Sequence, residues 1–141
     1  MHSFLNIKTK DVTLSGVAYS DKTYMVTGEK PFLSIELSPY SFKGESADFI
    51  TFDLAFLDSS KQHNIQLFWW GDNPATAVEK LSIHFSGGTG KYIVPLYASP
   101  SWERLQNVKG IRLYFDGSNK YQKVMIKNLQ LQYKTDHFVV D

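Results

Sequence analysis

The chain has 141 residues, of which 15 are basic and 14 acidic, so its net charge is +1. This balance argues against a dedicated nucleic-acid-binding protein and against a polybasic membrane anchor. Cysteine is absent, which excludes disulfides, thiolate catalysis and cysteine-type zinc sites. The length predicts a single domain over residues 1–141. Within an otherwise ordinary composition, the aromatic content of 15% stands out.

Apolar and polar residues alternate with period two along most of the chain, which indicates half-buried β-strands. Turns rich in Gly, Pro, Asn, Asp and Ser separate these runs. We expect about nine strands in an antiparallel two-sheet β-sandwich, an all-β fold. In chain order the strands cover 11–20, 22–28, 32–37, 48–58, 64–70, 81–85, 91–97, 111–116 and 121–133.

Local irregularities refine this prediction. Pro95 lacks a ladder donor, which favours an edge strand or a bulge, and a phase slip near Lys127 and Asn128 predicts a bulge in the last strand. In the strand 48–58, alternation turns Phe52 inward and Thr51 outward. The tail 135–141 is predicted to be either a final edge strand or a frayed end.

At most one or two short helical turns are expected. The segment 74–80 is one candidate. The segment 99–105 is the other, because Ser99 is a suitable N-cap and Pro100 suits the first helical position. Trp102, within this second segment, is predicted to seal one end of the sandwich.

No catalytic constellation is visible, so we expect a protein that is not an enzyme. The chain has no Gly-x-Ser-x-Gly elbow, and no carboxylate pair is marked by its surroundings. The glycine-rich run 86–90 lies between two strands rather than before a helix. No cofactor is expected, although acids near predicted strand ends leave open a structural calcium ion. These acids are Asp48, Asp58, Asp72, Asp116 and Asp136.

The strand 64–70 is the most informative segment, because it is apolar on both faces. Alternation sends Trp69 inward with the core and Gln66, Phe68 and Trp70 outward. Outward rings beside a polar amide are the combination that a sugar needs, since its C–H face stacks on a ring while its hydroxyls form hydrogen bonds. The alternative is that these rings lie under a second layer or pair across strands to stabilise the sheet.

Other strands supply further outward groups. Arg112 and Tyr114 alternate outward on 111–116, and His84 does so on 81–85. The histidine has the alternative interpretation of an ordinary surface residue. The sequence thus predicts a ligand-binding face that is formed by Gln66, Phe68, Trp70, His84, Arg112 and Tyr114.

The strand motifs follow one another in an order that resembles a known group of domains. They are FITFDL at 49–54, NIQLFWW at 64–70, GKYIVPL at 90–96, VKGIRLYFD at 108–116 and VMIKNLQL at 124–131. This order is similar to galactose-binding-like jelly rolls and carbohydrate-binding modules, with the match strongest over 31–133. It most resembles the sandwich domains appended to bacterial glycosyltransferases and surface-polysaccharide proteins. The resemblance implies a β-sandwich of the jelly-roll type.

Residues and resemblance together predict a non-catalytic carbohydrate-binding or glycan-positioning module, an accessory domain of a larger bacterial protein. Its expected partners are a glycan or polysaccharide and a tethered catalytic domain. The alternative is a structural or protein-interaction sandwich domain with no sugar site, which docks a protein partner through its aromatic face.

We expect no nucleic-acid partner and no membrane insertion by this segment. The chain shows no signal-peptide pattern and no apolar run of about 18 residues. It is therefore predicted to be cytoplasmic if the sequence is complete, and periplasmic or extracellular if it is a fragment of an exported protein.

Overall fold

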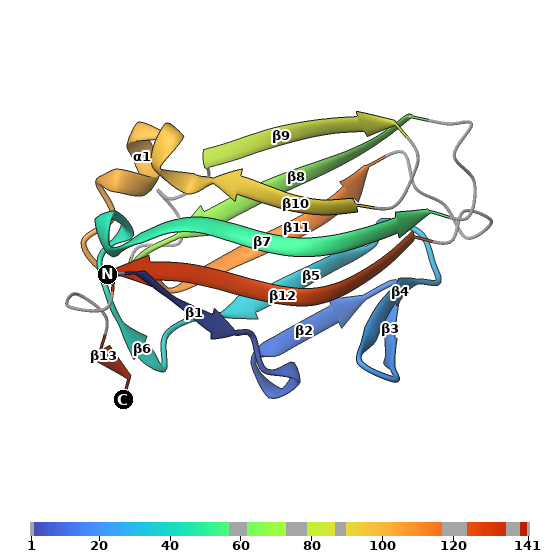
Figure 1. The fold of residues 1–141 in the computed structure, drawn as a ribbon, viewed down its shortest axis with the longest axis horizontal. Helices are drawn as coiled ribbons and strands as arrows, with labels where there is room; N and C mark the ends of the chain where they lie inside the picture. The colour runs from blue at the N-terminus through green and yellow to red at the C-terminus, as the bar shows by residue number, and fades with distance from the viewer. Residues whose placement is uncertain are drawn as a thin grey trace.

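The computed structural model describes residues 2–56, 62–72, 79–86, 90–116, 124–134 and 139–140. Within them the chain forms two antiparallel sheets that pack into a β-sandwich (Figure 1). The first sheet has the strand order β10-β7-β12-β4-β3, with β1 also paired to β12, and the second has the order β2-β5-β11-β8-β9. The predicted all-β sandwich is confirmed.

Each sheet contains strands from both halves of the chain. The first sheet contains β1 (His2–Asn6), β3 (Val17–Ser20), β4 (Thr23–Val26), β7 (Ala47–Phe56), β10 (Gly90–Pro95) and β12 (Val124–Lys134). The second contains β2 (Val12–Ser15), β5 (Phe32–Glu36), β8 (Gln62–Trp70), β9 (Glu79–Ser86) and β11 (Gly110–Asp116). We call them the β7–β12 sheet and the β8–β11 sheet.

Shorter elements complete the described part of the chain. The strands β6 (Tyr40–Ser41) and β13 (Val139–Val140) pair with each other, so part of the predicted tail is a strand. The helical elements are α1 (Pro100–Glu103) and the 3₁₀ turns η1 (Thr9–Asp11), η2 (Gly44–Ser46) and η3 (Leu96–Ala98). Of the other predicted helical segment, 74–78 lies outside the described residues, and Glu79 and Lys80 begin β9 instead.

The inward faces of both sheets form one apolar core. Phe52 and Leu113 are almost completely buried, as alternation predicts. Figure 1 shows α1 at one end of the sandwich, where Trp102 is fully buried. The Trp102 ring packs edge-on against Trp69 at a centroid distance of 5.8 Å, and its Nε1 donates a hydrogen bond to the Ala47 carbonyl at 2.8 Å. Trp102 therefore seals this end, as predicted.

Pro100 occupies the first position of α1 and Ser99 precedes it, as the sequence predicts. The Ser99 side chain does not cap the helix, however. Its backbone carbonyl accepts the hydrogen bond from the Trp102 amide, while its hydroxyl lies 3.4 Å from Ser101 Oγ. The N-terminus of α1 is thus capped by backbone hydrogen bonds only.

The predicted strand 11–20 is in fact two strands that belong to different sheets. Gly16 separates them with a φ of +60°, a left-handed conformation that glycine adopts without a Cβ clash. Its carbonyl accepts hydrogen bonds from the amides of Thr27 and Gly28. The chain therefore passes from β2 in one sheet to β3 in the other at this glycine.

The predicted irregularities of the β7–β12 sheet are found. The β7–β12 register shifts between Lys127 and Gln130, and Asn128 has a φ of +55°, so the bulge is confirmed. Pro95 ends β10, an edge strand. Thr51 lies on the outward face as predicted, directly opposite Ile93 and Gln130, yet it is buried.

Truncation in the core should be costly. Leu113→Ala is expected to lower the free energy of unfolding by about 2–5 kcal/mol, because it removes buried methyl groups and leaves a cavity. Ile93→Ala is the control, since this side chain is 59% exposed and its loss should change stability by about 0.5 kcal/mol or less. Urea denaturation measures both, and equal losses would contradict the assignment of the core.

Tyr24 offers a test that depends on pH. Its Oη is buried and has no hydrogen-bond partner in the described part of the chain. Burial, and secondarily the nearby Tyr19, raise the pKa of Tyr24. The folded state therefore favours the neutral phenol over the phenolate. Stability is unaffected by this group below the unfolded-state pKa of about 10, and it falls as the pH rises from there through the folded-state pKa.

We expect Tyr24→Phe to keep or increase stability at neutral pH, since an unpaired buried hydroxyl is unfavourable. The variant should also lose less stability than the wild type when the pH rises above about 10. Thermal unfolding midpoints at the two pH values measure this difference. A variant that is destabilised at neutral pH would show that the hydroxyl has a stabilising partner.

Candidate functional site

The outward face of the β8–β11 sheet carries the aromatic residues that the sequence singled out. Gln66, Phe68 and Trp70 are partly exposed, whereas the alternate residues of β8, including Leu67 and Trp69, are buried. The predicted face assignment of this strand is confirmed, because the core side of β8 faces the other sheet.

The pairing of β11 with β8 brings two further predicted residues to this face. Arg112 lies directly opposite Phe68, and Tyr114 lies directly opposite Gln66. Directly opposed residues of an antiparallel pair project from the same side of the sheet. Four of the predicted site residues therefore form one contiguous group.

Aromatic contacts hold this group together. The rings of Phe68 and Tyr114 meet edge to face, with centroids 5.2 Å apart and an interplanar angle of 79°. Phe32, from β5, lies on the other side of Tyr114 at a centroid distance of 5.4 Å. Such contacts fix ring positions before any ligand arrives and stabilise each pair by about 0.5–1.5 kcal/mol beyond simple burial.

Arg112 lies among these rings. Its guanidinium carbon is 4.5 Å from the centroid of Phe32, 5.8 Å from that of Tyr114 and 5.9 Å from that of Trp70. These distances are typical of cation–π contacts. Its Nη1 also donates a hydrogen bond to Tyr114 Oη at 3.0 Å. The cation is thereby held in a defined position on the face.

The indole of Trp70 lies directly against the backbone of Gly110, its cross-strand partner. A Cβ at position 110 would meet three ring carbons of Trp70 at distances that real Cβ atoms do not show. Only glycine therefore permits the observed ring position.

The face is hollowed next to these rings. A pocket of about 380 Å³ is lined by Lys30, Pro31, Gln66, Phe68, Tyr114 and Phe115. This volume falls within the range of about 300–1,000 Å³ that small-molecule pockets usually have. The pocket combines rings for stacking, an amide that both donates and accepts hydrogen bonds, and one cation.

The remaining predicted residue, His84, belongs to β9. The register pairs it with Asn64, two residues before Gln66 on β8. Its side chain lies outside the described part of the structure, so its role stays a prediction.

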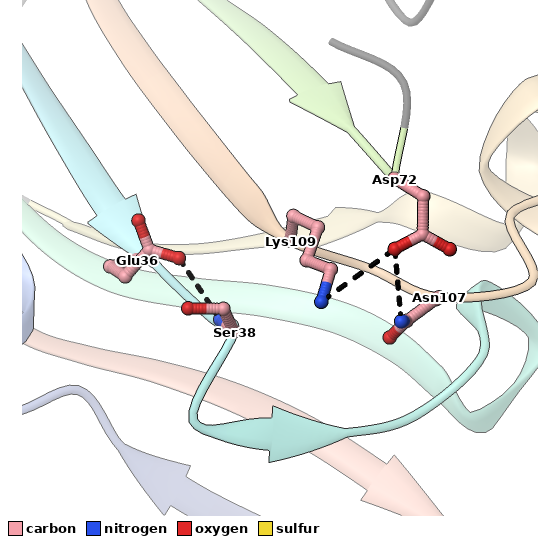
Figure 2. Close-up of polar contacts among 5 residues, drawn as sticks. All are labelled: Glu36, Ser38, Asp72, Asn107 and Lys109. Atoms are coloured by element: carbon pink, nitrogen blue, oxygen red, sulfur yellow. Dashed lines mark hydrogen bonds and ion pairs between the residues drawn. The ribbon is translucent and has the colours of Figure 1, made fainter.

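Some of the acids considered as calcium ligands also lie outside the described part of the structure, and others have partners within it. Asp58 and Asp136 lie outside the described residues, as does the side chain of Asp116. Figure 2 shows Asp72 beside two donors: its Oδ1 accepts a hydrogen bond from Asn107 at 3.1 Å and lies 3.6 Å from Lys109 Nζ. Asp48 pairs with Lys134 at 3.9 Å.

No group of His, Asp and Glu suited to a metal ion is found among the residues that the structure describes. The calcium site stays an untested prediction. Likewise, no helix in the described ranges is long and apolar enough to cross a membrane.

Three contributors to this site were not among the predicted residues. Phe32 is one that alternation could have found, since it lies out of phase with the buried Leu33 and Ile35. No sequence pattern indicated Lys30 or Gly110. Lys30 matters because it lines the pocket, and Gly110 because the Trp70 ring lies against it, and both contacts exist only in the folded chain.

Known proteins resemble this chain in structure but not detectably in sequence. No family profile and no curated protein matches the sequence. The carbohydrate-binding module CBM29_1 from Piromyces equi superimposes with a TM-score of 0.60 at 11% identity, covering 94% of this chain and 91% of that chain. The CBM22-1 xylan-binding domain of Paenibacillus barcinonensis Xyn10C gives a TM-score of 0.58 at 12% identity, covering 99% and 94%.

The chain has the β-sandwich fold of carbohydrate-binding modules. The agarase AgWH50C also contains this fold, with a TM-score of 0.66 at 12% identity, covering 93% of this chain but 24% of that chain. At such identities the likeness establishes the fold and no shared ligand. The family resemblance drawn from the sequence is confirmed at this level, and the link to glycosyltransferases stays a prediction.

The close contact of Trp70 with Gly110 can be tested directly. Trp70 is the partly exposed tryptophan, whereas Trp69 and Trp102 are buried, so acrylamide quenching of fluorescence reports mainly on Trp70. Gly110→Ala should displace the ring and increase quenching, because the new methyl group occupies its place.

Gly90→Ala is the matched control for this test, since a Cβ there would make only ordinary contact with Tyr92. It should leave the quenching unchanged. Unchanged quenching in Gly110→Ala would mean that the indole does not lie on the glycine.

Proposed function

We propose that the chain is a non-catalytic carbohydrate-binding module that binds a glycan on the outward face of the β8–β11 sheet. The observation that carries this proposal is the pocket of about 380 Å³ beside Phe68 and Tyr114. It adjoins an array of partly exposed rings that are held in place by one another and by Arg112. The shared fold of carbohydrate-binding modules adds support.

Binding follows from the chemistry of the face. The C–H side of a sugar ring stacks on Phe68 or Trp70 and removes apolar surface from water. The Gln66 amide and Tyr114 hydroxyl, which adjoin in register, form hydrogen bonds with sugar hydroxyls. The ring contacts already present reduce the entropy that is lost when the ligand binds.

We further propose that the domain is an accessory module of a larger bacterial protein that acts on or assembles a polysaccharide. Stacking plus a few hydrogen bonds gives weak single-site affinity. Tethering makes such binding effective by raising the local concentration of the partner domain at the glycan. The agarase comparison supports this arrangement, because the aligned region is about a quarter of that longer chain.

The alternative function is protein docking without a sugar site. The observation in its favour is that three large apolar side chains on the side of the β7–β12 sheet are exposed to solvent. They are Phe4, Ile93 and Tyr97, at 52%, 59% and 50%. These side chains do not line the pocket beside Phe68. Glycan titration separates the two functions.

Trp70→Ala is the central test of glycan binding. We expect the fold to be retained, because the ring is partly exposed, while glycan affinity falls at least about fivefold, corresponding to the loss of ~1 kcal/mol of stacking. Tyr97→Ala removes an exposed ring outside the site and serves as the control. Calorimetric titration with xylan, mannan, β-glucan and agarose oligosaccharides measures the affinities, and thermal melting checks the fold.

Each titration is repeated with calcium and with a chelator, which tests the predicted structural calcium ion. Equal binding by Trp70→Ala and the wild type would place the site elsewhere. An unfolded Trp70→Ala would assign this ring to the core. Failure of the wild type to bind any neutral or acidic glycan would favour the docking function.

A further inference from the structure

Lys30, at the edge of the pocket, has an unusual backbone conformation. Its φ is +47°, in the left-handed region that side chains with a Cβ rarely adopt. The following residue is Pro31, which restricts the preceding backbone further. Glycine would fit this position better, yet the chain has an exposed lysine that lines the pocket. A positive φ at a lysine that lines a pocket prompts the hypothesis that the side chain acts there.

Arg112 is a second cation of the same face, and it has no carboxylate partner among the described residues. The ion pairs found in those residues involve Lys109 and Lys134 instead. Arg112 is partly buried, and its Nε has no hydrogen-bond partner in the described part. Aromatic faces stabilise the guanidinium, but they do not neutralise its charge. The face therefore has a fixed cation that lacks a counter-ion in this part of the protein.

Glu36, an acid of this face whose side chain is described, lies away from the pocket. Glu36 is paired in register with Gly110, at the Trp70 end of the sheet, and Figure 2 shows its side chain turned to Ser38, whose amide donates a hydrogen bond to it at 3.1 Å. Asp116 directly follows the pocket residue Phe115 at the other end of β11, and its side chain lies outside the described part of the structure. Among the described residues that line the pocket, Lys30 is charged and none is acidic.

We propose that the ligand is an acidic glycan, whose carboxylate or sulfate groups are recognised by Lys30 and Arg112 while its sugar rings stack on Phe68 and Trp70. This inference rests on the proposed function and specifies its ligand class. Arginine suits both anions, because its planar donors match their oxygens. Arg112 is linked to the pocket through its hydrogen bond to Tyr114, a residue that lines the pocket together with Lys30.

The test compares each acidic polymer with its neutral counterpart. Polygalacturonate is paired with its carboxyl-reduced form, and κ-carrageenan with its desulfated form, so that the two arms distinguish carboxylate from sulfate. We expect the wild-type chain to bind one of the acidic polymers at least about tenfold tighter than its neutral partner. This preference should decrease as salt is added.

Lys30→Gly is the decisive variant, because it removes the cation and relieves the backbone strain together. It should melt at the same temperature as the wild type or higher, yet lose most of the preference for the acidic polymer. Lys22→Gly is the matched control, since Lys22 is also an exposed lysine with a positive φ, +59°, and does not line the pocket. It should keep the preference.

Equal affinities within both polymer pairs would overturn the inference, and binding of neutral glycans would then leave the proposed function intact. An unchanged preference in Lys30→Gly, or an equal loss in Lys22→Gly, would also overturn it, because the attraction would then be unrelated to the pocket. If the wild type binds none of these polymers and none of the neutral oligosaccharides, both proposals fail.

Discussion

The antiparallel pairing of β8 with β11 is the constraint on which both the core and the candidate site depend. Leu67 and Leu113 oppose each other on the inward face, and Phe68 and Arg112 oppose each other on the outward face. A shift of one residue would exchange the two faces of a strand. Burial of the apolar side therefore sets the register, and the same register places the rings and the cation of the site side by side.

The candidate site contains features that do not favour folding by themselves, and the stability of the core compensates for them. Outward rings on a sheet expose apolar surface, and Lys30 adopts a backbone conformation that glycine would adopt more easily. Neither feature stabilises the fold on its own. The rings are ordered by contacts among themselves and with Arg112, and the sandwich below them is closed by Trp102. Stability thus resides in the core, which leaves the outer face available for binding.

Period-two alternation was enough to predict the sandwich, most of its strands and the outward position of Phe68, because these depend on which side of a strand is apolar. It failed at Gly16, where the strand 11–20 divides between two sheets. The choice of sheet depends on partners far away in the sequence. Alternation placed Thr51 on the outward face correctly, but it gave no sign that this residue is buried there, between the paired strands β10 and β12.

The candidate site was only partly predictable. Five of its members followed from alternation on two strands, but the pairing of those strands and the place of Phe32 in the ring cluster depend on contacts between distant parts of the sequence. The positive φ of Lys30 and the close approach of Trp70 to Gly110 are properties of the folded backbone. The low identity to known carbohydrate-binding modules means that no ligand residue can be transferred from them, so the site rests on its own geometry.

The most direct measurement is a map of backbone amide shifts by NMR during titration with a glycan oligosaccharide that the chain binds. The account predicts that the largest changes lie at Phe68, Arg112 and Tyr114, while the amides of Thr51 and Ile93 on the other sheet stay unchanged. Large changes confined to the β7–β12 sheet would contradict it, because the ligand would then occupy the opposite face of the sandwich.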